Sequence, residues 1–410
     1  MLPAKVMTRA YTDSVGKQSR IDELNSLQTN VIRKIQRGLG AGTLALCVAI
    51  GGASSEAADW NPKAAAAYLD RRAEWWITWP AAARDQGTFC ISCHTALPYA
   101  LSRPALRAAL DEKAPSASEQ KLLNSITKRV RSWQEVKPFY GDRDGFNKGL
   151  QSRGTESVLN ALILANLDAR TGNLSGDTRT AFRNLWALQE TAGDEKGAWP
   201  WLDFGNEPFE AKDSQFYGAC LAAIAVGTAP ENLRAASEAA DKIAPLREYL
   251  RREYANQSLI NQVALLWASA RLPGLLTSGE QASITEAVLR KQQADGGWSL
   301  SSLVWSLKGA TLKSLVKLWI RSENSPLQAK SDGYATGLTV FALEQVGFSV
   351  SDIRLQRGLA WLKTNQNPTD GRWPGYSLNH RRDPSSATGL FMSDAATAYA
   401  VLAAVGADWR

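Results

Sequence analysis

Two cysteines and a histidine stand close together in the first quarter of the chain, in the order Cys90-Ile91-Ser92-Cys93-His94. This C-x-x-C-H spacing is typical of covalent haem attachment, because each thiol adds to one vinyl group of the porphyrin and the following histidine can bind the iron. The spacing predicts one haem c on Cys90 and Cys93, with His94 as the proximal iron ligand. The alternatives are a disulfide or redox dithiol formed by the two cysteines, or half of a zinc site.

Covalent haem attachment takes place outside the bacterial cytoplasm, so the motif requires an export signal. Three basic residues within 33–37 precede an apolar run at 39–50, and small residues then lead to Ala57. This layout is typical of a secretory signal peptide, and an apolar run of roughly a dozen residues is too short to span a membrane. We therefore expect residues 1–57 to be a leader and residues 58–410 to form one soluble periplasmic domain without a membrane span.

The charge of the chain indicates no nucleic-acid partner. It carries 47 basic and 40 acidic residues, a formal net charge of +7, and the basic residues do not gather into a patch. A weak positive charge without a cluster does not provide the electrostatic surface that nucleic acids require. The partner expected for a haem protein of this kind is a redox protein.

The apolar residues from position 61 onward recur with helical spacing, and no convincing strand alternation is found. Two kinds of helix alternate along the chain. Helices dominated by small and apolar residues are expected to be buried, and more charged helices are expected to lie outside them. The buried kind is predicted at 155–167, 214–226, 259–270, 334–346 and 395–405, and the outer kind at 177–190, 231–252, 280–293 and 352–365. This alternation predicts an all-α fold, an (α/α) barrel of about six helical hairpins.

The turns after the outer helices share a second pattern, Q-x-x-x-G-x-W. It is complete at Gln292, Gly296 and Trp298, and it recurs with insertions at 189–199 and 366–373. Glutamine can cap the end of the outer helix, glycine permits a tight turn, and tryptophan can pack across neighbouring hairpins. The pattern therefore predicts a repeated joint between hairpins.

Together with the helix starts at 334–337 and 393–398, these turns resemble the squalene–hopene cyclase and prenyltransferase repeat superfamily over roughly residues 60–410. The resemblance implies a barrel with a central hydrophobic cavity of the kind that binds isoprenoids. It does not extend to the chemistry, because the chain lacks both the Asp-x-Asp-Asp acid motif of the cyclases and the zinc motif of the protein prenyltransferases. Terpene cyclisation by the usual acid motif is therefore not expected, and whether the protein is an enzyme is left open.

Two residues are candidates for the sixth position of the iron. After residue 57 the chain has one further histidine, His380, and one methionine, Met392. Both lie just before the last predicted inner helix, as His94 lies just before the first. If the ring of hairpins closes, these segments meet at the same end of the barrel, and a methionine ligand would raise the reduction potential. A five-coordinate or water-bound iron is the alternative.

These observations predict a periplasmic c-type haem protein on a squalene-cyclase-like barrel. It would transfer electrons, or oxidise a hydrophobic, isoprenoid-like substrate in its cavity. The alternative is an isoprenoid-binding or cyclase-like protein without haem, in which Cys90 and Cys93 form a disulfide. A third possibility is a structural ring whose cavity is filled by side chains.

Overall fold

The structure is a computed structural model that describes residues 60–142, 147–235, 237–305, 330–380 and 382–407. By its internal contacts the chain divides into two units, Met1–Glu56 and Ala57–Arg410. The expected leader lies outside the described residues. Within the second unit, the described residues form helices joined by turns and loops, with two isolated β-bridges.

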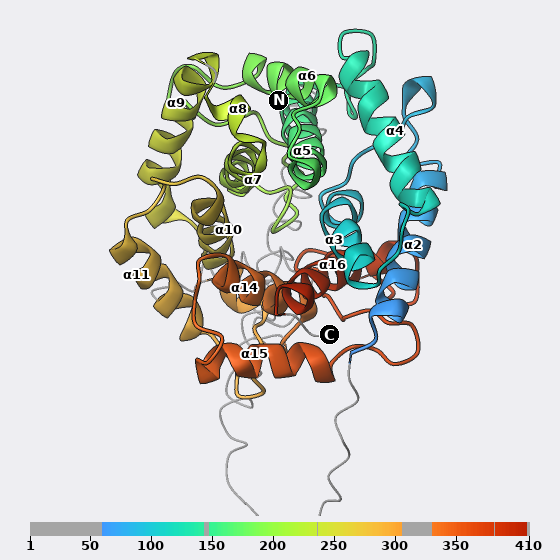
Figure 1. The fold of residues 1–410 in the computed structure, drawn as a ribbon, viewed down its shortest axis with the longest axis vertical. Coiled ribbons are helices and arrows are strands. Elements are labelled where there is room, and N and C mark those ends of the chain that lie inside the picture. Colours follow the sequence, from blue (N-terminus) through green and yellow to red (C-terminus); the bar gives the residue numbers. More distant parts are fainter. Residues whose placement is uncertain (1–59, 143–146, 236, 306–329, 381, 408–410) are drawn as a thin grey trace, which may run out of the picture. The chain divides into compact units, whose positions relative to one another are not determined.

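An inner ring of helices forms the centre of the second unit (Figure 1). Among the described residues, six helices contact one another in sequence, and the last returns to contact the first. The six inner helices therefore form a closed ring, which is the core of the barrel. The inner helices are α3 (Ala96–Ala109), α5 (Lys148–Thr171), α7 (Ser214–Thr228), α10 (Leu259–Arg271), α14 (Gly333–Gln345) and α16 (Phe391–Gly406).

A second set of six described helices lies outside this ring, and each contacts inner helices. They are α2 (Pro62–Thr78), α4 (Ala117–Arg131), α6 (Gly176–Ala187), α9 (Ser237–Glu253), α11 (Ser278–Leu289) and α15 (Ile353–Thr364). The connections contain the short elements α8 (Glu231–Arg234), α12 (Leu300–Val304), η1 (Asp85–Gly87), η2 (Tyr254–Asn256) and η3 (Thr388–Leu390). The predicted all-α fold, an (α/α) barrel of about six hairpins, is confirmed.

Burial explains which helices lie inside. Nearly every residue of α7 is buried, including its glycine and alanine residues, because small side chains let neighbouring inner helices approach on all sides.

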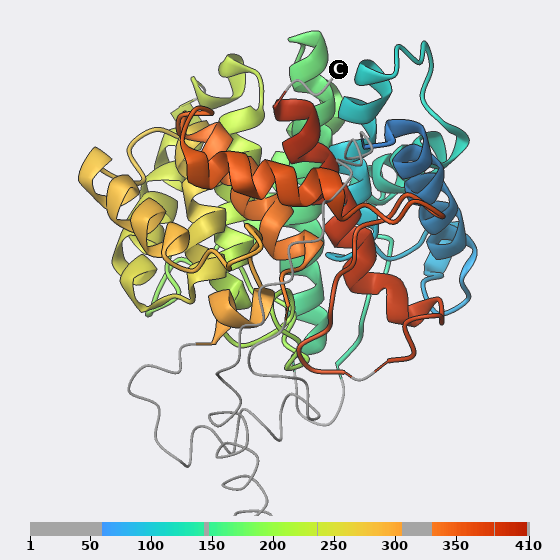
Figure 2. The same cartoon turned by 90° about the horizontal axis from the view of Figure 1, so that it is seen from below.

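In the side view of Figure 2, α16 lies next to the outer helix α15. The stretch Thr388–Gly406 is apolar and long enough to cross a membrane by length and composition alone, but 67% of it is buried inside the protein. Its apolar character therefore fits a helix of the barrel core.

The Gln–Trp turns join each outer helix to the next hairpin. The side chain of Gln366 donates from Nε2 to the carbonyl of Gly371 at 2.8 Å and to that of Asn61 at 3.0 Å, and its Oε1 accepts from the Asn61 amide at 2.6 Å. This turn therefore ties the last hairpin to the start of the first. Equivalent bonds join Gln189 to Gly197 and Lys242, and Gln292 to Gly296 and Arg354.

The tryptophans of these turns are fully buried and hydrogen-bonded. Trp373 donates from its indole nitrogen to the Leu362 carbonyl of the preceding outer helix at 2.7 Å. The other two make the same kind of bond, Trp199 to Leu185 and Trp298 to Val288. Each joint therefore combines a buried aromatic ring with satisfied polar atoms, which is what a close-packed contact between hairpins requires.

Candidate functional site

A cavity of about 1030 Å³, including its open mouth, lies at the N-terminal ends of the inner helices. Its walls come mainly from three segments, each of which leads into an inner helix: the motif loop before α3, the loop before α7, and the segment before α16. Because every such connection runs from an outer to an inner helix, all of them emerge at the same end of the barrel. The fold therefore brings together residues that are about 300 positions apart in the sequence.

All five residues singled out from the sequence line this cavity. Cys90, Cys93 and His94 enter from the motif loop, His380 enters from the segment before α16, and Met392 enters from the first turn of α16. The juxtaposition follows from closure of the ring, because α16 contacts both α2 and α3. Residues from near the N-terminal and C-terminal ends of the barrel domain therefore line the same cavity.

The two cysteines are buried and free, so the disulfide considered from the sequence is not formed. Burial raises the pKa of Cys90 to about 12 and also raises the pKa of Cys93. A thiol with a raised pKa is protonated near neutral pH, and the thiol is a much weaker nucleophile than the thiolate. A cysteine nucleophile at this position is therefore disfavoured.

His94 is held by a chain of hydrogen bonds that ends at α16. Its Nδ1 lies 2.9 Å from the hydroxyl oxygen of Thr95, and this hydroxyl donates to Oδ2 of Asp394 at 2.7 Å. Because the Thr95 hydrogen is committed to the carboxylate, Nδ1 carries the proton and donates to Thr95. The lone pair of His94 is then on Nε2, the ring nitrogen that is left to accept a hydrogen bond from a ligand.

Aromatic packing and burial keep His94 neutral. Its ring lies against Phe391, with centroids 4.0 Å apart, and it meets Trp76 edge-on at 5.1 Å. Burial, followed by the charges of Arg382 and Arg72, lowers the pKa of His94 to about 3. Near neutral pH the side chain therefore serves as an uncharged hydrogen-bonding group.

Asp394 anchors this chain in the core. Arg72 donates to both oxygens of the carboxylate, from Nε at 2.7 Å and from Nη2 at 2.9 Å, and the hydroxyl of Tyr68 donates at 2.8 Å. Burial raises the pKa of Asp394, and the bidentate guanidinium opposes this by favouring the ionised form. The motif loop is thereby fixed to α2 and α16 at once.

Two glutamates of the loop before α7 face the same cavity, and the sequence reasoning missed both. Burial raises the pKa of Glu210 to about 7, although hydrogen bonding from Asn206 and the charges of Arg382 and Lys148 act in the opposite direction. The backbone of this loop is held by a short bridge, in which Glu210 and Asn206 exchange N–H to carbonyl bonds of 2.8 and 2.9 Å. Glu210 is therefore a carboxyl that is about half protonated near pH 7.

Glu207 connects the loop before α7 to the segment before α16. The backbone N–H of Glu207 donates to Oδ1 of Asn379 at 2.7 Å, and Nδ2 of Asn379 donates to the Glu207 carboxylate. His380 lies beside this contact, with Nε2 2.7 Å from Oδ1 of Asn206. The two loops are therefore locked together across the mouth of the barrel.

The remaining wall is rich in aromatic rings. At the rim, Tyr140 and Phe204 meet edge-to-face with centroids 5.1 Å apart, and both are partly exposed. Hydroxyl and amide side chains also line the cavity, among them those of Ser377 and Asn379. The aromatic lining consists of Trp76, Trp79, Tyr140, Phe204, Phe209 and Phe391. Flat apolar faces with polar groups between them suit a neutral ligand that carries hydroxyl groups.

Comparison with known proteins gives the following findings. No protein-family model matches the chain, and no curated protein matches it. Solved structures described as glycosidases are similar in fold: a wild-type glycosidase at 15% identity and a TM-score of 0.45, and a variant in complex with glucose at 14% and 0.43. Each alignment covers 83% of this chain and 98% of the other. No residue role is taken from those proteins.

These findings correct the expected function. The described residues contain no group of three or more His, Cys, Asp or Glu side chains that could hold a metal ion. The expectation of a haem protein for electron transfer or oxidation is therefore wrong, as is the alternative that depended on a Cys90–Cys93 disulfide. Haem attachment at Cys90 and Cys93, with Met392 or His380 opposite His94, stays a sequence-based prediction, as does the resemblance to the cyclase and prenyltransferase superfamily.

Proposed function

We propose that the cavity at the N-terminal ends of the inner helices is the active site of a hydrolase that cleaves an acetal bond in a small, neutral, hydroxyl-bearing substrate of the carbohydrate class. The observation that carries the proposal is Glu210, a carboxyl in an aromatic cavity with its pKa raised to about 7. A carboxyl with such a pKa is partly protonated near neutral pH and can give its proton to a leaving group.

The reaction uses the two glutamates in different roles. Glu210 gives its proton to the bridging oxygen as the bond between that oxygen and the acetal carbon breaks. The Glu207 carboxylate takes a proton from a water molecule, whose oxygen bonds to the same carbon. One water molecule is consumed, and a proton moves from the water to Glu207 while another moves from Glu210 to the leaving alcohol. Two carboxyl groups flanking the scissile bond are the usual arrangement for this chemistry.

Substrate binding is assigned to the neutral groups of the wall. The rings of Trp76, Trp79 and Phe391 offer flat surfaces to the apolar faces of a sugar. Nε2 of His94 accepts a hydrogen bond from a hydroxyl group, since its Nδ1 is already occupied by Thr95. A neutral imidazole suits this role because it adds no charge beside the carboxyl that must remain protonated.

The test is hydrolysis of a panel of alkyl glycosides by the purified protein and by Glu210→Gln. Loss of a general acid typically costs about 10²- to 10⁴-fold in rate, so we expect kcat on the best substrate to fall by at least about 100-fold. Glu344→Gln is the matched control, because burial raises the pKa of Glu344 to about 8 but this residue does not line the cavity. The proposal fails if no glycoside is hydrolysed, or if the two substitutions have equal effects.

A further inference from the structure

A second cavity of about 770 Å³, including its open mouth, lies at the C-terminal ends of the inner helices. It shares no lining residue with the first cavity. Each of the six inner helices contributes an apolar or aromatic side chain to its wall: Leu101, Leu162, Ile224, Trp267, Phe341 and Leu402.

Two arginines bring positive charge to this cavity. Arg170 is in the last turn of α5 and donates to the Pro104 carbonyl at 3.2 Å, and Arg271 ends α10 and donates to Oε1 of Gln345 at 2.5 Å. Both acceptors are neutral. Within the described part of the chain neither arginine forms an ion pair, and no aspartate or glutamate lines the cavity. Since arginine stays protonated in proteins, two positive charges lie at this cavity, and the acidic charge that acts on Arg170, that of Glu119, lies outside its lining.

Trp267 adds a hydrogen-bond donor that is not satisfied. Its side chain is buried at 4% exposure and packs against Phe341, with ring centroids 5.2 Å apart. The indole N–H has no acceptor among the described residues. A buried donor without an acceptor is unfavourable, so an acceptor atom on a bound ligand would be favoured here.

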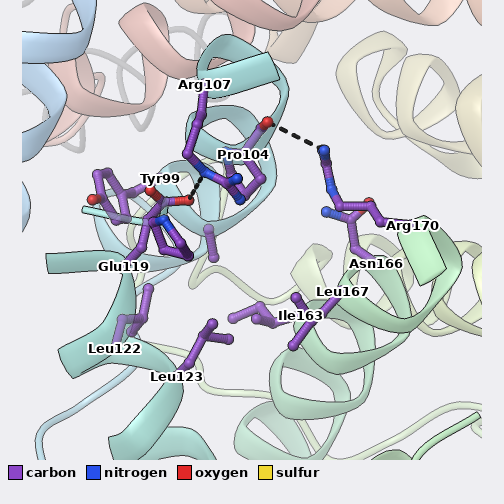
Figure 3. Close-up of a pocket in the computed structure, with 12 residues that line it drawn as sticks. Tyr99, Pro104, Arg107, Glu119, Leu122, Leu123, Ile163, Asn166, Leu167 and Arg170 are labelled. Carbon is purple, nitrogen blue, oxygen red and sulfur yellow. Dashed lines mark hydrogen bonds and ion pairs between the residues drawn. The ribbon is translucent and has the colours of Figure 1, made fainter. Parts of the chain in front are cut away.

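The neighbouring pocket between α3, α4 and α5 shows the contrast (Figure 3). It also has apolar walls, including Leu122 and Ile163, and it shares Arg170 with the second cavity. In that pocket, however, Glu119 lies 3.4 Å from Arg107 and balances its charge. That pocket is lined by two arginines and one glutamate, whereas the second cavity is lined by two arginines and no acidic residue.

We propose that the second cavity binds a small amphipathic anion, a carboxylate or sulfonate on an apolar body. The acid group would lie near Arg170 and Arg271, whose guanidinium groups match the geometry of such anions. The apolar body would lie against the inner-helix side chains, and an oxygen could accept from Trp267. This site is separate from the proposed hydrolase site and does not depend on it.

The arginines have a structural role that must be distinguished from ligand binding. Cations in the last turn of a helix stabilise its free carbonyl groups. That role would not discriminate between an anionic and a neutral ligand of the same shape. Binding of matched charged and uncharged probes therefore separates the two roles.

The experiment compares anilinonaphthalene sulfonate with the uncharged N-phenylnaphthylamine, measured by fluorescence titration of the whole protein. Charge-assisted hydrogen bonds predict that the double variant Arg170→Gln/Arg271→Gln binds the sulfonate at least about tenfold more weakly, with unchanged binding of the neutral probe. The control is Arg183→Gln/Arg290→Gln, which removes the same charge from exposed positions in α6 and at the C-cap of α11. We expect this control to change sulfonate binding by less than about twofold.

A salt titration gives a second readout that needs no substitution. The wild-type affinity for the sulfonate should fall as sodium chloride is added, while that for the neutral probe should not, because salt screens charges at a partly open site. The proposal is overturned if the double variant and the control bind the sulfonate alike. It is also overturned if both probes lose affinity equally in the double variant.

Discussion

Replacing Asp394 by asparagine tests the network that holds His94 in place. In the wild-type chain the carboxylate accepts two bonds from Arg72 and one each from Tyr68 and Thr95. The side chains of Arg72 and Asp394 are only 8% and 2% exposed. The substitution leaves a buried guanidinium without a counter-charge, and it weakens the acceptor that orients the Thr95 hydroxyl.

The expected cost follows from burial. Removing one partner of a buried ion pair typically costs about 3–5 kcal/mol. Nη2 of Arg72 keeps its bond to the Ala387 carbonyl, at 2.8 Å, so we expect the lower end, about 3 kcal/mol, in urea unfolding at pH 7. Nitrogen NMR of His94 gives an independent readout. Because Thr95 is no longer committed as a donor to a carboxylate, the single Nδ1–H form should become a mixture of tautomers.

An exposed pair with the same geometry provides the control. Arg131 donates to Asp177 from Nε at 2.7 Å and from Nη2 at 2.8 Å, but Arg131 is 66% exposed. Exposed pairs contribute at most about 1 kcal/mol, so Asp177→Asn should cost less than that. If the two substitutions cost the same, or if His94 keeps one tautomer in Asp394→Asn, the reasoning from burial and from the hydrogen-bond chain is refuted.

Three further predictions concern other parts of the chain. Exported protein should have the intact mass expected for cleavage near Ala57, and a soluble product that keeps residues 39–50 would contradict this. Gly371→Ala should lower the free energy of unfolding by about 2–5 kcal/mol, because φ is +83° and the new Cβ would lie 2.3 Å from the Ala64 carbonyl carbon. The control is Gly347→Ala, where φ is +74° but no atom lies near the new Cβ, and it should lower the free energy of unfolding by only about 1–2 kcal/mol. Because the folded pKa of Glu210 is raised, its contribution to stability is full below about pH 4.5 and is lost as the pH rises through about 7. The stability difference between wild type and Glu210→Gln should therefore change by up to about 3 kcal/mol across that window, and a flat difference would contradict the raised pKa.

The barrel could be predicted because it repeats. Small-residue and charged helices alternate regularly, and the Gln–Trp turns mark the joints, so the helices were located to within a few residues in most places. There are two exceptions: the outer helix predicted at 231–252 is observed as two helices, α8 and α9, and α5 is predicted at 155–167 but observed at Lys148–Thr171. Its first turns carry polar residues such as Lys148 and Gln151 beside the cavity mouth, and an apolar pattern cannot detect a helix end that has no apolar face.

The candidate site was predictable only in part. Topology alone was enough to bring His94, His380 and Met392 together, because equivalent connections emerge at the same end of a closed ring. Glu207 and Glu210 were missed because they lie in an irregular loop where no periodicity or motif marks them. A short motif such as C-x-x-C-H describes only five residues. It carries no information about the acidic and aromatic side chains that other segments bring to the same cavity.

The most direct test of the central claim is the dependence of the Glu210→Gln rate on the leaving group. If Glu210 gives its proton to the departing oxygen, the variant should be impaired by at least about 100-fold on alkyl glycosides, which need protonation. It should be nearly as active as the wild type on dinitrophenyl glycosides, whose leaving group departs without a proton. An equal loss on both kinds of substrate would contradict the assignment of Glu210 as the general acid.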